Sequence, residues 1–103
     1  MKFETILKNK YNINPSTYME KARKRAASLG YNINNLSFSD DGKHKMDYDG
    51  ISFGNVDNKD FIIYSLISPE KAYRKKKAYH ARMFADIPGR EITKKMRLTR
   101  ILW

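Results

Sequence analysis

The sequence predicts a small single α+β domain over residues 1–103: an N-terminal helix, a three-stranded antiparallel sheet with a β-hairpin at 44–53, and basic C-terminal helices. Three observations support this fold class. At two places an amphipathic helical pattern begins with a capping residue followed by proline. In the middle of the chain, alternating apolar residues flank an Asp-Gly pair. The length of 103 residues, 41% of them hydrophobic, suits one domain with a modest core.

Two helical segments are expected before the sheet. Residues 2–8 place apolar side chains at helical spacing, enough for one or two turns. A longer helix begins at Asn14-Pro15, where an N-cap precedes proline at the first helical position, and it ends at Gly30. Its apolar stripe, spaced by three and four residues, consists of Met19, Ala22, Ala26 and Leu29.

The sheet is predicted from a hairpin and one further strand. Residues 44–48 and 51–53 flank Asp49-Gly50, a two-residue turn that matches the twist of paired strands. Residues 61–66 predict the third strand, because this run is apolar enough to be buried on both faces. The register that follows in the hairpin pairs Tyr48 with Ile51, Met46 with Phe53, and Asp47 with Ser52.

Two further helices are expected after the sheet. The first begins at Ser68-Pro69 and ends at Pro88-Gly89, and the second covers residues 91–100. After them, Ile101-Leu102-Trp103 forms an apolar tail that folds back onto the body. The residues expected to face inward are Ala72, Tyr79 and Met83, with Tyr73, His80, Phe84 and Ile87 beside them, and then Ile92, Met96 and Leu98 or Thr99.

Positive charge is concentrated in the last third of the chain. Residues 69–103 hold eleven basic and three acidic residues, which is +8 of the chain's net +10. Residues 1–39 carry +5, whereas residues 40–68 carry −3, with three basic and six acidic residues. A polyanion should therefore be attracted to both ends of the sequence and repelled from its middle.

No combination of catalytic or metal-ligating residues is recognisable, so we expect no enzymatic activity, no cofactor and no metal. The absence of cysteine excludes disulfides and thiolate sites and fits a reducing, intracellular compartment. Counted from Asp47, a calcium loop would need Gly at the position of Ser52 and Glu at that of Asn58. His44 and His80 have no paired carboxylate or second His at ligand spacing, and no nucleophile elbow or phosphate loop occurs.

The basic residues of the last third are the candidate nucleic-acid-binding residues. Acids at the i+4 positions are nearly absent here, so salt bridges within the helix do not account for the charge. Contact with a phosphate backbone, without reading of base sequence, is the preferred interpretation; a solvated helix face is the alternative. The candidates are Lys71, Arg74, Lys75, Lys77 and Arg82 on one helix, extended by Arg90, Lys94, Lys95, Arg97 and Arg100.

Two groups of neighbouring residues carry expectations of their own. The aromatic residues interleaved with the charge, Tyr73, Tyr79 and Phe84, are expected in the core, whereas an exposed one could stack on bases. In contrast, we expect little polyanion contact from the lysines of the middle segment, because they stand among six aspartates in the sequence. These lysines are Lys43, Lys45 and Lys59.

From Tyr48 onward the chain shares a pattern with known sequences. The pattern is Gly, a two-residue step and Phe-Gly, then Asp with an aromatic, a Lys/Arg-rich helix with Tyr-x-x-Arg, and a closing Leu-Trp. It resembles a family of small uncharacterised basic proteins of large double-stranded DNA viruses and phages. That resemblance implies a viral setting, without an established activity; where the family often has His after the arginine, this chain has Met83. The matching residues are Gly50 to Gly54, Asp60-Phe61, Arg74 to Lys77, Tyr79 with Arg82, and Leu102-Trp103.

These observations lead to two hypotheses. The first is a non-enzymatic viral accessory or virion protein that binds nucleic acid, duplex DNA above all, or an acidic protein surface. The second is a capsid or assembly component that docks on another viral protein through Ile101, Leu102 and Trp103. Since the longest mostly apolar run, 61–67, is too short to cross a membrane and residues 1–10 lack a signal-peptide core, we expect no membrane partner. The expected location is a virion or the interior of an infected cell.

Overall fold

The computed structural model describes residues 1–84, 89 and 91–103. Its strands form one antiparallel sheet in the order β1-β2-β3, with helices before and after it, which confirms the predicted α+β fold class. The elements in chain order are α1 (Phe3–Tyr11), α2 (Pro15–Ser28), the 3-10 turn η1 (Ile33–Asn35), β1 (Leu36–Phe38), β2 (His44–Tyr48), β3 (Ile51–Asn55), α3 (Phe61–Ile67), α4 (Pro69–Met83), α5 (Lys94–Leu98) and the 3-10 turn η2 (Thr99–Ile101).

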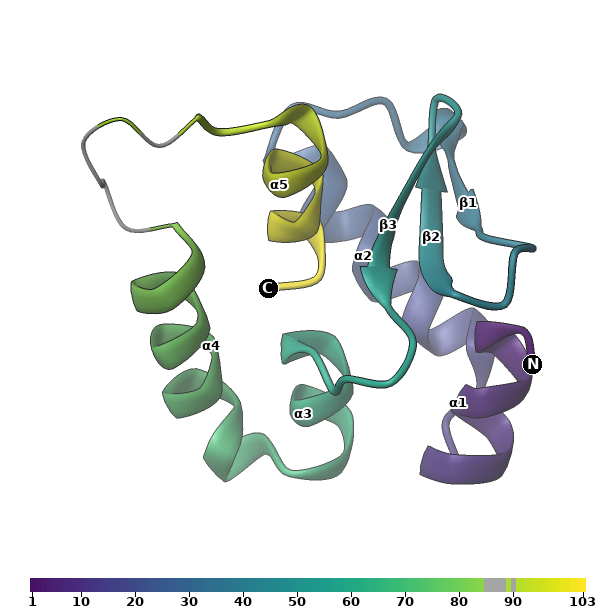
Figure 1. The fold of residues 1–103 in the computed structure, drawn as a ribbon. Helices are drawn as coiled ribbons and strands as arrows, with labels where there is room; N and C mark the ends of the chain where they lie inside the picture. Colours follow the sequence, from purple (N-terminus) through teal and green to yellow (C-terminus); the bar gives the residue numbers. More distant parts are fainter. Residues whose placement is uncertain (85–88, 90) are drawn as a thin grey trace.

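Helix α2 lies behind the sheet and the other helices are arranged around these two layers (Figure 1). Helix α1 packs on α2 near one end of the sheet, whereas α5 packs on β3. Helices α3 and α4 form a helical pair to the side of the sheet. The C-terminus lies between that pair and the sheet, so the last residues of the chain contact both.

Helix α2 has the predicted bounds. The Asn14 side chain accepts a hydrogen bond from the backbone N–H of Ser16 (2.9 Å), and Pro15 begins the helix. At the other end Gly30 adopts a φ of +89°, which a side chain would disfavour, and this reversal lets the N–H of Tyr31 bond to the carbonyl of Ala26 (2.9 Å). Of the predicted stripe Met19, Ala22 and Ala26 are buried, but Leu29 is exposed, and Tyr18 is buried in addition.

The hairpin also has the predicted turn and register. Asp49 and Gly50 have φ angles of +51° and +83°, the left-handed pair that a tight two-residue hairpin turn needs. Tyr48, Met46 and Phe53 are buried on one face, while on the other the hydroxyl of Ser52 donates a hydrogen bond to Asp47 (2.5 Å). The partners are Tyr48 with Ile51, Met46 with Phe53, and Asp47 with Ser52.

The predicted third strand at 61–66 is wrong: this run forms helix α3, and the third strand is β1. Asp60 begins α3 by accepting a hydrogen bond from the N–H of Ile63 (2.8 Å). The helix then buries Ile62 and Ile63 together. A short apolar run fits a buried strand and a buried helix equally well, and here the aspartate cap and the packing select the helix. Strand β1 was not predicted, because a strand of three residues is too short to show a clear alternation of apolar and polar residues.

Helix α4 begins at Pro69 as predicted, but it ends at Met83 with Phe84 as its C-cap, so the predicted end at Pro88-Gly89 is wrong. The predicted inward position of Ile87 lies outside the described residues. The last helix, expected over 91–100, is divided into α5 and η2. It begins later because the side chain of Thr93 caps it by accepting from the N–H of Met96 (3.2 Å). Ile92 lies before that cap and is exposed, so its predicted inward position is wrong.

The apolar tail folds back as predicted. Ile101 and Leu102 are fully buried and belong to the same core as Phe3, Leu98 and Phe53. The carbonyl of Leu102 also accepts a hydrogen bond from the N–H of Phe61 (3.0 Å), a helix-end donor of α3 with no partner inside its own helix. The end of the chain is therefore part of the frame that positions α3 and, through it, α4.

Candidate nucleic-acid interface

Helix α4 exposes five of its six Lys and Arg side chains to solvent, and the sixth, Lys76, is half-buried. Ala72 is buried, and Tyr79 and Met83 are half-buried, as the predicted seam requires. Among the residues that the structure describes, no carboxylate forms an ion pair with a basic residue of α4. The predicted binding residues on this helix are all exposed: Lys71, Arg74, Lys75, Lys77 and Arg82.

Four of the five remaining predicted residues lie on α5 and η2, the two elements next to the C-terminus. Lys94, Lys95 and Arg97 are exposed on α5, and Arg100 is exposed on η2. The Lys95 ammonium lies 3.2 Å from Nε2 of His44, and the Arg100 guanidinium lies 4.8 Å from the ring centre of Phe84. Arg90 lies outside the described residues.

Two stacked aromatic rings connect α4 to the C-terminus. The rings of Tyr79 and Trp103 are parallel within 2°, with their centres 4.0 Å apart. His80 Nε2 lies 2.9 Å from the backbone oxygen of Trp103, which ties the same two segments a second time. Burial raises the pKa of Tyr79, so its hydroxyl stays neutral at physiological pH.

Two hollows of about 450 and 320 Å³ border this stack and share Asn58, Tyr79 and Trp103 in their linings. We call them together the Trp103 groove. The described residues that line it include no Asp or Glu. Its exposed cations come from four separate parts of the fold: Lys75 and Arg82 from α4, Lys95 from α5, Lys59 from the segment before α3, and Lys43 from the segment before β2.

Lys43 and Lys59 were not among the predicted binding residues. Lys59 lies with its ammonium 5.8 Å from the ring centre of Tyr64, and Lys75 lies 6.0 Å from the same ring. The expectation for these two lysines rested on the charge of their segment, but three of its aspartates, Asp40, Asp41 and Asp60, are paired within the fold. Asp40 pairs with Lys2 (3.4 Å), for example. No pattern in the sequence places Lys59 beside α4, because that proximity depends on how α3 packs.

The third lysine of that segment, Lys45, is buried within the fold. Its ammonium donates to Asp60 Oδ2 (2.8 Å) and to the carbonyl of Asn58 (2.6 Å), and the Tyr18 hydroxyl donates to the same carboxylate oxygen (2.5 Å). Lys45 is 2% exposed, and Tyr18 and Asp60 are fully buried. Burial and then the Asp60 charge raise the pKa of Tyr18 well above its ordinary value, so its hydroxyl keeps its proton. This cluster, the Lys45–Asp60–Tyr18 joint, connects β2, α2 and α3.

His44, for which no carboxylate partner was expected, pairs with Asp41. Its Nδ1 lies 2.5 Å from Asp41 Oδ2, and the N–H groups of Lys43 and His44 donate to Asp41 Oδ1 (2.8 Å each). These hydrogen bonds, that to the imidazole first, hold the pKa of Asp41 below its usual range. In the described part of the chain no three His, Asp or Glu side chains gather as a metal ion would require.

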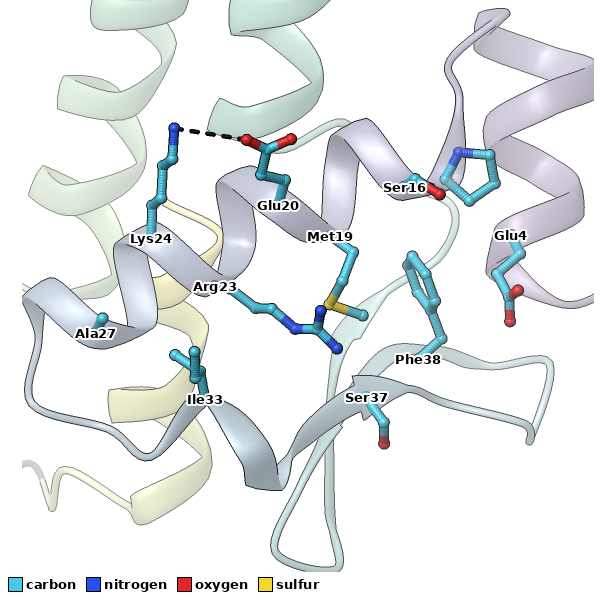
Figure 2. Close-up of a pocket in the computed structure, with 11 residues that line it drawn as sticks. Glu4, Ser16, Met19, Glu20, Arg23, Lys24, Ala27, Ile33, Ser37 and Phe38 are labelled. Carbon is cyan, nitrogen blue, oxygen red and sulfur yellow. Dashed lines mark ion pairs between the residues drawn. The ribbon is translucent and has the colours of Figure 1, made fainter.

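A separate hollow of about 670 Å³ lies between α2 and β1 (Figure 2). Met19, Ile33 and Phe38 give it an apolar lining, and Glu20 and Lys24 form an ion pair of 3.7 Å at its rim. Because it carries charges of both signs, it attracts a polyanion less than the Trp103 groove does.

No protein-family model, curated protein or solved structure matched this chain. Over the described ranges, none of the helices combines the length and apolar character needed to cross a membrane.

Proposed function

We propose that this protein binds the phosphate backbone of nucleic acid without reading base sequence, as a non-enzymatic accessory or virion component of a virus or phage. The observation that carries the proposal is the exposed row of cations on α4, which continues into the Trp103 groove. Exposed like charges repel one another, and a polyanion relieves that repulsion while releasing its counterions. The viral setting rests on the resemblance of residues 48–103.

Two features favour backbone contact over base reading. Lysine predominates in the run 75–77, and an ammonium group contacts phosphate as a point charge with little geometric selectivity. Helix α4 also contains no Asn or Gln, the side chains that read adenine through two hydrogen bonds. The helix therefore suits positioning on a backbone rather than recognition of one site.

The docking hypothesis has less support from this fold. Ile101 and Leu102 are 0% and 1% exposed, since they fill the chain's own core, and of the three proposed docking residues only Trp103 has partly exposed surface. That surface belongs to the Trp103 groove, which is lined with cations. An apolar partner surface would be a poor match for it.

The test is the salt dependence of binding to labelled duplex DNA of two unrelated sequences. We expect similar affinities for both, and a logarithmic salt slope of about −0.9 per phosphate contact, or about −4 to −5 if the five exposed cations of α4 all make contact. Strong preference for one sequence, or no binding at low salt, would refute the proposal.

Charge-neutralising variants locate the surface. Replacing Lys71, Arg74, Lys75 and Arg82 by Gln should abolish most binding, with a salt slope smaller by about one per lost contact. Replacing Lys43, Lys59 and Lys95 by Gln should also weaken binding, since these residues line the Trp103 groove. The control replaces three exposed cations that lie on α1 and α2 and do not line the Trp103 groove, Lys8, Lys10 and Arg23, and it should change affinity least. Equal losses in both triple variants would mean that net charge alone, and not this surface, sets the affinity.

A further inference from the structure

The other flank of α4 exposes an aromatic ring. Tyr73 is 77% exposed, more than any other large hydrophobic side chain in the described part of the chain. Its predicted position in the core is wrong because the helix turns this residue away from Ala72, which occupies the buried side. A single exposed aromatic ring is common on protein surfaces, so the significance of Tyr73 depends on the groups around it.

The Tyr73 ring packs against a second aromatic ring, that of Phe61. It contacts Phe61 edge-on, with the ring centres 5.7 Å apart and the planes inclined by 62°. Phe61 is itself held by two cations, Lys76 at 4.8 Å and Arg25 at 5.0 Å from its ring centre. The Tyr73 ring is thus anchored along one edge while most of its surface faces solvent.

Cations surround this ring on both sides. Tyr73 borders a hollow of about 370 Å³ between α2, α3 and α4, lined also by Lys21 and Lys24. It borders a second, shallow hollow of about 490 Å³ with Lys76 and Lys77. No Asp or Glu is among the described residues that line either hollow, although Lys24 pairs with Glu20 at 3.7 Å. We call Tyr73 with these four lysines the Tyr73 patch.

We propose that the Tyr73 patch binds single-stranded nucleic acid, with an unpaired base stacked on Tyr73 and the adjoining phosphates held by Lys21 and Lys77. This inference rests on the proposed function and specifies the form of nucleic acid that α4 prefers. An exposed aromatic ring between lines of cations is the arrangement by which proteins bind single strands without sequence preference.

The chemistry of the ring distinguishes the single strand from other polyanions. Inside a duplex both faces of each base are covered by neighbouring pairs, so a protruding tyrosine has no base face to meet. An acidic peptide without aromatic residues would satisfy the lysines but would offer no ring to stack on Tyr73. Of these polyanions, the single strand is the one whose repeating unit presents both a phosphate and an uncovered planar ring.

The experiment compares binding of an oligo-dT strand and of a duplex of equal length at the same salt. The wild type should prefer oligo-dT, and Tyr73→Ala should weaken oligo-dT binding roughly 5- to 100-fold while leaving duplex binding nearly unchanged. Tyr73→Phe keeps the ring and should retain the preference. If Tyr73→Ala lowers the thermal midpoint, Tyr73→Leu carries the test, because it keeps an apolar contact with Phe61 but has no π face.

The outcomes separate this inference from the proposed function. Binding of both forms with no effect of Tyr73→Ala leaves the phosphate-binding proposal standing and overturns this one. An equal loss for strand and duplex, or equally strong competition by poly-glutamate against oligo-dT, also overturns it. Absence of binding to either nucleic acid refutes the proposed function, and this inference with it. Lys77→Gln is the matched control on the same helix flank, and it should weaken both forms alike.

Discussion

Lysine has opposite roles in two regions of this molecule. In the Lys45–Asp60–Tyr18 joint, the Lys45 ammonium is buried and bonded to a carboxylate and a carbonyl. On α4, the ammonium groups of Lys71 and Lys77 face solvent with no carboxylate at ion-pair distance among the described residues. The first arrangement is complete without a ligand, whereas the second leaves its charge for a partner outside the chain.

The partners of a charged residue, and not its type or its segment, therefore indicate its role. Judged by local charge, Lys45 and Lys59 belong together, since both stand among aspartates in the segment of net charge −3. In the fold, one fills the joint and the other lines the Trp103 groove beside α4. Mutations in the joint should therefore change stability, and mutations on α4 should change binding.

The largest effect is expected from Lys45→Met. Removing the ammonium leaves the Asp60 carboxylate buried with only neutral donors, which should lower the free energy of unfolding by about 3–5 kcal/mol. Urea unfolding followed by circular dichroism measures the change. Lys43→Met, at an exposed position two residues away, is the control and should change stability by less than about 0.5 kcal/mol. Similar small effects for both variants would break the distinction between joint and surface.

The second largest loss of stability is expected at Gly54, whose backbone lies against Lys45 of the joint and against Leu102. Gly54 has a φ of +82°, and a Cβ there would lie 2.7 Å from Leu102 Cδ1 and 3.2 Å from Lys45 Cβ. Gly50 has nearly the same φ, +83°, but no atom within 4 Å of the added Cβ. Thermal or urea unfolding should therefore show a loss of about 2–3 kcal/mol for Gly54→Ala, with strain and crowding combined, and about 1 kcal/mol for Gly50→Ala, with strain alone. Equal losses would show that crowding at Gly54 is relieved by movement of Leu102.

Arg25 is intermediate between the buried joint and the exposed surface of α4. It sits between the Tyr73 patch and the core, and its Nε and one terminal nitrogen donate to the carbonyls of Ile101 (2.6 Å) and Arg100 (3.0 Å). Because these donors are used within the chain, Arg25→Met should lower the free energy of unfolding by about 1–2 kcal/mol. Its effect on nucleic-acid affinity, measured where both proteins are folded, should be smaller than that of Lys77→Gln. If Arg25→Met reduces the free energy of binding by more than it reduces the free energy of unfolding, Arg25 belongs to the binding surface.

The parts of the fold that were predictable are those specified by local chemistry. Asn14-Pro15, Asp49-Gly50 and Ser68-Pro69 each set a boundary through a cap, a turn or a fixed φ, and each boundary is where the sequence places it. In contrast, the run 61–66 has no local feature that selects strand or helix apart from Asp60, whose carboxylate caps α3. The prediction at 61–66 used the apolar run alone and left out the cap residue before it, so it gave the wrong element.

The candidate site was predictable in its charge but not in its shape. The exposure of Lys75 and Arg82 could be predicted from the helical period of α4. Apolar residues spaced by three and four positions mark the buried side of a helix, and these two cations lie off that side. The stack of Tyr79 on Trp103 and the position of Lys59 depend on contacts between segments far apart in the sequence. Tyr73 shows the limit most clearly, because the same pattern that placed the cations outside placed this ring beside the core.

The smallest expected effect lies at the turn before β2, where an aspartate is engaged on the surface. The hydrogen bonds from His44 and Lys43 hold the pKa of Asp41 below its usual range of about 4. A carboxyl whose pKa is lower in the folded state stabilises the fold above its ordinary pKa and loses that contribution as the pH falls. The difference in thermal midpoint between wild type and Asp41→Asn should therefore be present at neutral pH and shrink as the pH drops below about 4.

The matched control is Asp57→Asn, another exposed position, whose carboxylate makes no hydrogen bond or ion pair with the described residues. The difference in thermal midpoint between Asp57→Asn and wild type should change less between neutral and acid pH than the difference for Asp41→Asn. The Asp41 variant should also bind duplex DNA no more weakly than wild type, since it removes a negative charge near Lys43, Lys95 and the Trp103 groove. A difference in midpoint for Asp41→Asn that persists at acid pH would show that the amide distorts the turn, and that the charge of Asp41 does not stabilise it.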